Sequence, residues 1–105
     1  MSRVFAPVRE TSIEAYERIR KTGTLGDMQR QVLLTIARFP NRTDREIARI
    51  MAGAALYDPN RVRPRRVELL KRGYIEVAGK RICSVSGATA YTWRIKTHHD
   101  QGELF

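Results

Sequence analysis

The chain has 105 residues, 42% hydrophobic and 30% charged, which predicts one small folded domain and excludes a disordered chain. Its formal net charge of +9 favours a polyanionic partner, with nucleic acid ahead of an anionic membrane surface. No apolar run is long enough to span a membrane, and the single cysteine, Cys83, excludes an internal disulfide and suits the reducing cytosol where we expect the protein.

The first ten residues lack periodicity, and Pro7 favours an extended arm over residues 1–10. A helix is predicted next, within residues 11–24, because Thr11 and Glu14 have the spacing of a capping box. Three apolar residues at three-residue intervals form its buried side: Ile13, Tyr16 and Ile19. We expect this helix to lie across the domain or to form the contact in a homodimer.

Two further helices precede the basic part of the chain. The first is predicted over Asp27–Phe39 and ends before Pro40. The second begins at Thr43, which forms a capping box with Glu46, and stops at Gly53. The apolar stripes of the two helices contain Met28, Val32, Leu33, Ile36, Ala37 and Phe39, and then Ile47, Ala48, Ile50 and Met51.

The segment Asn60–Gly73 predicts a fourth, strongly basic helix. Its basic residues are Arg61, Arg63, Arg65, Arg66, Lys71 and Arg72. On a helical wheel Arg61, Arg65 and Arg72 share one narrow sector, opposite an apolar stripe of Val62, Leu69 and Leu70, which predicts arginines facing outward. The start lies between residues 59 and 64, and Pro64 is favoured as the first helical residue because an interior proline loses a backbone hydrogen bond.

The pattern then changes to a period of two residues. Short strands are predicted over 74–77, 80–85 and 89–95, with a turn or bulge at Gly79 and a hairpin turn over 86–88. Tyr91, Trp93 and Ile95 alternate on one face of the last strand. Exposed aromatic rings could stack on bases, but this alternation favours a place in the core.

The fold class is therefore mainly α with a small antiparallel β-hairpin, an α+β fold. The order of elements over residues 25–97 resembles a winged helix-turn-helix domain with an extra N-terminal helix. The runs that carry the resemblance are TDREIA, NRVRPRRVELLKRGYI and KRICSVSGATAYTWRI. The string ETSIEAY, together with GKRICSVSGATAYTW, is similar to small winged-helix proteins encoded by bacteriophages and prophages.

The resemblance implies binding of double-stranded DNA, with the basic helix in the major groove and the hairpin, or wing, near the backbone or minor groove. The tip of the predicted wing, residues 86–89, has no positive charge, which argues against insertion of an arginine into the minor groove. The implied contacts to base edges or phosphates are Arg61, Arg63, Arg65, Arg66, Arg72, Thr43, Arg45, Lys80 and Arg81.

Such a protein could serve as a transcriptional regulator or as a replication accessory factor. The alternatives are a protein-interaction module whose basic helix binds an acidic partner, and an RNA-binding protein. We expect no enzyme and no cofactor, because no phosphate-binding glycine loop, serine elbow or carboxylate pair is present. His98 and His99 beside Asp100 are interpreted as part of a plain tail and not as metal ligands.

The tail, residues 98–105, ends in a short motif. Gln101, Leu104 and Phe105 resemble the peptide by which many bacterial replication and repair proteins bind the sliding clamp. Two apolar side chains would enter a preformed pocket while the glutamine donates and accepts orienting hydrogen bonds. Gly102 departs from the usual larger residue at the second position. The motif predicts a sliding clamp as a second partner.

Overall fold

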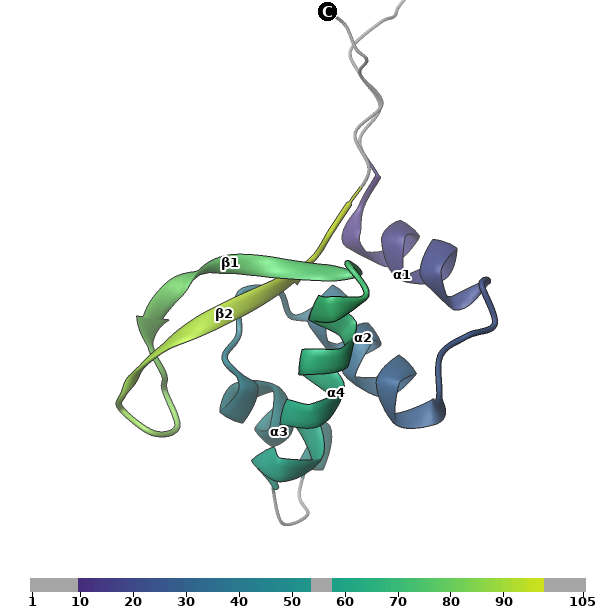
Figure 1. Ribbon diagram of the computed structural model, residues 1–105. Helices are drawn as coiled ribbons and strands as arrows, with labels where there is room; N and C mark the ends of the chain where they lie inside the picture. The colour runs from purple at the N-terminus through teal and green to yellow at the C-terminus, as the bar shows by residue number, and fades with distance from the viewer. Residues whose placement is uncertain (1–9, 54–57, 98–105) are drawn as a thin grey trace, which may run out of the picture.

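The computed structural model describes residues 10–53 and 58–97. Within these ranges the chain forms four helices followed by a two-stranded antiparallel hairpin, which confirms the α+β fold class (Figure 1). The elements are α1 (Ser12–Arg20), α2 (Asp27–Arg38), α3 (Asp44–Ala52), α4 (Pro59–Lys71), β1 (Ile75–Ile82) and β2 (Thr89–Ile95). None of the helices in the described ranges is long and apolar enough to cross a membrane.

Helix α2 forms the centre of the core. It packs against the three other helices and against β2. The buried apolar residues come from every element and include Ala15, Tyr16, Ile19, Val32, Leu33, Ile36, Ile47, Val62, Leu69, Ile75, Trp93 and Ile95. Two residues expected in this core are exposed, Ile13 and Phe39. Phe39 follows the last residue of α2 and has φ −129° and ψ 72°. Because this backbone conformation is not helical, its side chain does not continue the apolar stripe of α2.

The predicted capping boxes are both present. The Thr11 hydroxyl accepts from the backbone N–H of Glu14, whose carboxylate accepts from the backbone N–H of Thr11. Thr43 and Glu46 repeat this arrangement at the start of α3. Each box satisfies backbone donors that a helix N-terminus otherwise leaves unpaired. The boundaries of α1 and α3 at their N-terminal ends therefore follow directly from the sequence.

Helix α4 begins at the early end of the predicted range. Asp58 caps it by accepting from the backbone N–H of Asn60 at 2.9 Å, and Pro59 is the first helical residue. Pro64 therefore lies inside the helix, and the prediction that Pro64 starts it is wrong. An acidic cap followed by proline is a strong start signal, and its position decides the boundary even though Pro64 cannot donate to the Asn60 carbonyl.

The hairpin contains two strands and not three. β1 runs continuously through Gly79, and the register shifts between Val77 and Gly79, so the expected irregularity at Gly79 is a β-bulge. On its other edge β2 is hydrogen-bonded to the backbone of the α2–α3 connection. Trp93 accepts from the backbone N–H of Asn41 at 2.8 Å and donates to the Arg42 carbonyl at 3.2 Å. The hairpin is thus fixed to the helices on one edge.

Candidate nucleic-acid interface

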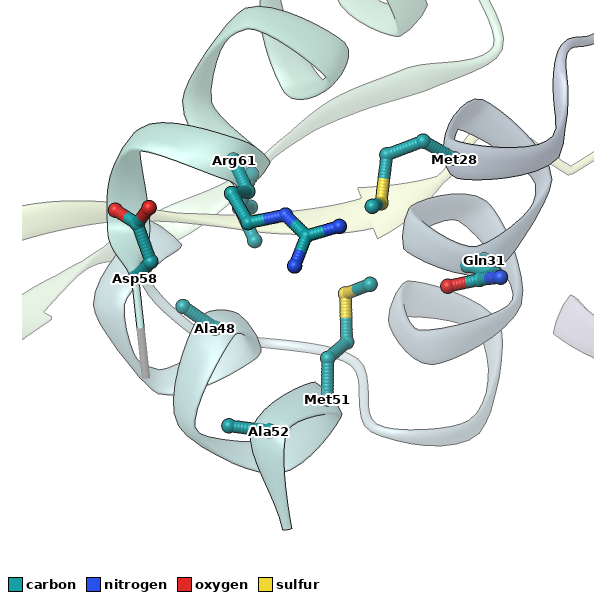
Figure 2. Close-up of a pocket in the computed structure, with 8 residues that line it drawn as sticks. Met28, Gln31, Ala48, Met51, Ala52, Asp58 and Arg61 are labelled. Carbon is teal, nitrogen blue, oxygen red and sulfur yellow. The ribbon is translucent and has the colours of Figure 1, made fainter. Parts of the chain in front are cut away.

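Two arginines of the sector predicted to face outward, Arg61 and Arg65, lie on the side of α4 next to α2. Figure 2 shows the Arg61 guanidinium between Met28 of α2 and Met51 of α3, in a small pocket that these residues line. Arg65 donates to Glu68 at 3.1 Å, and Glu68 accepts from Gln29 of α2 at 2.8 Å. Arg61 is exposed, as the sector predicted, and Arg65 is partly exposed, but both lie beside α2.

The reason is a rotation of the buried stripe. Val62 and Leu69 are buried, whereas Leu70 is only partly buried. The buried side of α4 is therefore centred on Val62 and Leu69, and not on the predicted stripe that also includes Leu70. The sector of Arg61 and Arg65 moves towards α2 as a result. Arg72, which follows the last helical residue, extends to the α1–α2 connection, where it donates to the Thr24 carbonyl at 3.4 Å.

On the opposite side of α4, Arg66 joins three elements. Its guanidinium donates to both carboxylate oxygens of Asp44, at 2.9 and 2.7 Å, and lies 4.3 Å from the centre of the Trp93 ring. The side chain is only 15% exposed. Arg66 therefore connects α4 to the start of α3 and to β2, and its Nε and Nη2 groups are used within the protein.

Arg81 is also engaged within the protein, through Glu46. The Glu46 carboxylate is buried and accepts from Arg81 at 3.0 Å, from the backbone N–H and hydroxyl of Ser84 at 2.8 and 2.7 Å, and from the backbone N–H of Thr43 at 3.0 Å. Burial raises the pKa of Glu46, but these hydrogen bonds outweigh it and lower the pKa to about 2. Glu46 thereby holds the end of β1 against α3.

The burial of Glu46 was not foreseen. The sequence predicted Glu46 only as the second residue of a capping box with Thr43, and this local pattern does not show contacts with the distant residues Arg81 and Ser84. The predicted phosphate contact by Thr43 does not fit the structure, because this side chain is 1% exposed and its hydroxyl lies 3.0 Å from Cys83 Sγ. Burial raises the pKa of the Cys83 thiol, and hydrogen bonds from Thr43 and Ser86 more than reverse this, so that it is lowered overall.

An open cleft of about 310 Å³ separates the hairpin from the starts of α3 and α4, and we call it the α4–hairpin cleft. Figure 1 shows the hairpin extending away from α4 on this side. Arg45 of α3 and Arg63 of α4 line the cleft, and both are exposed. Lys80 of β1 is exposed and lies 5.3 Å from the ring centre of Tyr91, another lining residue. Two predicted cationic contacts therefore line the cleft, and a third lies beside one of its lining residues.

Arg63 differs from Arg66 although both lie near Asp44. The Nε of Arg63 is 3.8 Å from the Asp44 carboxylate, and the Arg63 side chain is 48% exposed. A long pair with an exposed guanidinium group is weak. Since a weak pair restrains the guanidinium little, Arg63 can turn towards a phosphate or a base edge.

The aromatic residues of β2 do not share one environment. Trp93 is buried as expected, but Tyr91 is 53% exposed, so its expected place in the core is wrong. Between them Thr92 is fully buried and donates to the side chain of Asn41. β2 is covered on both faces where it meets the α2–α3 connection, and it loses this cover towards the hairpin turn. The alternation of residues along β2 does not show where along the strand this cover ends.

The remaining predicted sites lie outside the described residues. These are the N-terminal arm over residues 1–9, the histidines at 98 and 99, and the clamp-binding motif of Gln101, Leu104 and Phe105. Within residues 10–53 and 58–97, no group of three or more histidine, cysteine, aspartate or glutamate residues could hold a metal ion.

Comparison of the chain with protein-family models, with curated proteins and with solved structures gave no match. The resemblance to winged-helix proteins therefore rests on the order of elements and on short motifs.

Proposed function

We propose that the protein binds double-stranded DNA and that its helices α2 to α4 with the hairpin act as a winged helix-turn-helix domain. The observation that carries the proposal is the convergence of three exposed cations, Arg45, Arg63 and Lys80, from three different elements around the α4–hairpin cleft. The net charge of +9 supports a polyanionic partner.

We expect some of the exposed residues to contact base edges and others to contact phosphates. The face of α4 away from the core carries Asn60, Arg63 and Lys71, all exposed. In the major groove, arginine pairs best with guanine and asparagine with adenine, while lysine neutralises phosphates. In this proposal Arg45, which lines the cleft, and Lys80, beside Tyr91, contact the phosphates that flank this site.

Two arginines of the predicted set take another role in this proposal. Arg66 and Arg81 are bound to Asp44 and Glu46, and they fix the angle between the hairpin and the helices. A rigid angle lowers the cost of binding, because less conformational freedom is lost when the partner docks. We expect both residues to affect affinity through the position of the hairpin.

The wider setting is also a proposal. A small basic protein with one cysteine suits the bacterial cytosol or nucleoid, and the phage-like motifs suit a phage-encoded protein acting in its host. Its task is transcriptional regulation or assistance in replication, and the predicted tail motif would deliver it to a sliding clamp. A homodimer would form through α1.

The first experiment measures binding of a labelled, random-sequence DNA duplex by fluorescence anisotropy at low and near-physiological salt. If three cations each neutralise one phosphate, log K should fall with log salt with a slope of about −3. In a random-sequence duplex no guanine is fixed opposite Arg63, which then contacts a phosphate, so Arg63→Ala should weaken binding and reduce this slope by about 1. The matched control is Arg38→Ala, an exposed arginine at the end of α2, which should change neither.

The outcomes separate the alternatives. Absence of duplex binding even at low salt contradicts the proposal and favours an acidic protein partner. Tighter binding of duplex RNA of the same sequence would favour an RNA partner. It would also contradict binding through a helix in the major groove, because the major groove of duplex RNA is too narrow for side chains to read.

A further inference from the structure

An exposed aromatic ring forms part of the wall of the α4–hairpin cleft. Tyr91 has 53% of its surface exposed although its strand neighbours Thr92 and Trp93 are buried. The Lys80 ammonium group lies over its ring, 5.3 Å from the centre, and the centre of the tilted Trp93 ring is 6.4 Å away. An aromatic ring beside cations is the composition with which proteins bind unpaired nucleotides.

Trp93 cannot offer a stacking surface of its own. It is 5% exposed, and the Arg66 guanidinium lies over its ring at 4.3 Å. Its indole N–H, however, is buried and has no acceptor among the described residues, a state that costs free energy. This unpaired donor belongs to a residue that also lines the cleft. Tyr91 is left as the surface on which a base can stack.

The size of the cleft limits the occupant. About 310 Å³ is at the lower end of the range of about 300–1,000 Å³ found for small-molecule sites. This volume is suited to one nucleotide, and a duplex would lie across the opening. Arg63 at the cleft and Lys80 beside Tyr91 supply the positive charge that phosphates on either side of a bound nucleotide require.

We propose that the α4–hairpin cleft binds one unpaired nucleotide of the DNA, with its base stacked on Tyr91 and its phosphates near Arg63 and Lys80. The inference rests on the proposed DNA binding and makes it more specific. The preferred substrate becomes a duplex that contains an unpaired nucleotide, such as a bulge, and not a fully paired duplex.

The test uses the full chain and two labelled duplexes of the same sequence, one fully paired and one with a single-nucleotide bulge. Anisotropy gives the affinities. Tryptophan emission reports on the cleft directly, because Trp93 is the only tryptophan in the chain. We expect the bulged duplex to bind at least about fivefold tighter, the lower limit for one stacked base, and to quench Trp93 emission more strongly than the paired duplex does.

Variants of the hairpin identify the ring that is responsible. Tyr91→Ala should remove the preference for the bulged duplex and leave affinity for the paired duplex nearly unchanged, while Tyr91→Phe should keep the preference because the ring remains. Ile82→Ala is the matched control, since Ile82 is 65% exposed on the same hairpin and lies outside the lining of the cleft. It should change neither affinity.

Equal affinity for the two duplexes, or a preference that survives Tyr91→Ala, overturns this inference and leaves the proposed DNA binding intact. If neither duplex binds, both proposals fail. A free mononucleotide that quenches Trp93 emission, with no preference for the bulge, would assign the cleft to a small effector and would also overturn the inference.

Discussion

The two sides of α4 use the same residue type differently. On the side next to α2, Arg61 lies among methionines and Arg65 pairs with Glu68 of its own helix. On the side next to the hairpin, Arg66 joins α3 to β2 and Arg63 stays largely exposed at the cleft. What an arginine does here depends on which acceptors reach it from other elements.

Arg63 and Arg66 make the contrast sharpest because they lie near the same carboxylate. Arg66 forms two short hydrogen bonds to Asp44 and is 15% exposed, whereas Arg63 remains 3.8 Å away and is 48% exposed. A bidentate, partly buried pair is stronger and more specific in geometry than an exposed one. Arg66 therefore stabilises the fold, and Arg63 is available to a partner.

The largest effect is expected from breaking the support of the hairpin at Glu46. Glu46→Ala removes the acceptor of Arg81, of both Ser84 donors and of the Thr43 N–H. Loss of this buried network should lower the free energy of unfolding by about 2–4 kcal/mol, measured by urea denaturation at pH 7. Glu14→Ala is the control, because the same capping box at α1 is exposed, and it should cost about 1 kcal/mol or less. Equal losses in the two variants would contradict a special role for Glu46.

The same carboxylate predicts a pH dependence. Its pKa is about 2 in the folded protein against an ordinary value of 4.5, so its contribution is fully present above about pH 4.5 and is lost as the pH falls towards 2. The wild type should therefore lose stability across this interval, and Glu46→Gln should lose less. Urea midpoints of the two proteins at pH 7, 4.5 and 3 measure the difference. Parallel curves would show that Glu46 is not the titrating group.

A smaller effect separates the two arginines at Asp44. Arg66→Ala leaves the partly buried Asp44 without its bidentate partner and uncovers the Trp93 ring, which should cost about 1–3 kcal/mol of stability. Arg63→Ala should change stability by no more than about 0.5 kcal/mol. Thermal unfolding of both variants measures this difference. A destabilised Arg63 variant would remove the distinction on which the proposed contact depends.

The local signals were sufficient for much of the fold. Thr11–Glu14 and Thr43–Glu46 identified two helix starts because a capping box uses only neighbouring residues. The side of α4 that carries each function was not predictable in this way. A helical wheel shows which residues share a sector, but it does not show that Asp44 and Trp93 approach Arg66 from elsewhere in the chain.

The environment of Tyr91 shows the same limit. Alternation along β2 predicts which side chains share a face, but the Arg66 guanidinium that lies over Trp93 on that face comes from α4, a separate part of the chain. Contacts between distant segments are not present in a local pattern. The exposed ring and the cleft beside it therefore became visible only in the structure.

The smallest effect tests the α2 side of α4. Because Arg61 and Arg65 face α2, the double variant Arg61→Ala, Arg65→Ala should weaken duplex binding only through the general loss of charge, and by less than Arg63→Ala alone. Anisotropy at near-physiological salt, where distant charges are screened within about 8 Å, measures the difference. Unfolding curves of both proteins provide the control for folding. If the double variant loses more affinity than Arg63→Ala, the DNA contacts the α2 side of the helix, and the contact assigned to the cleft side is wrong.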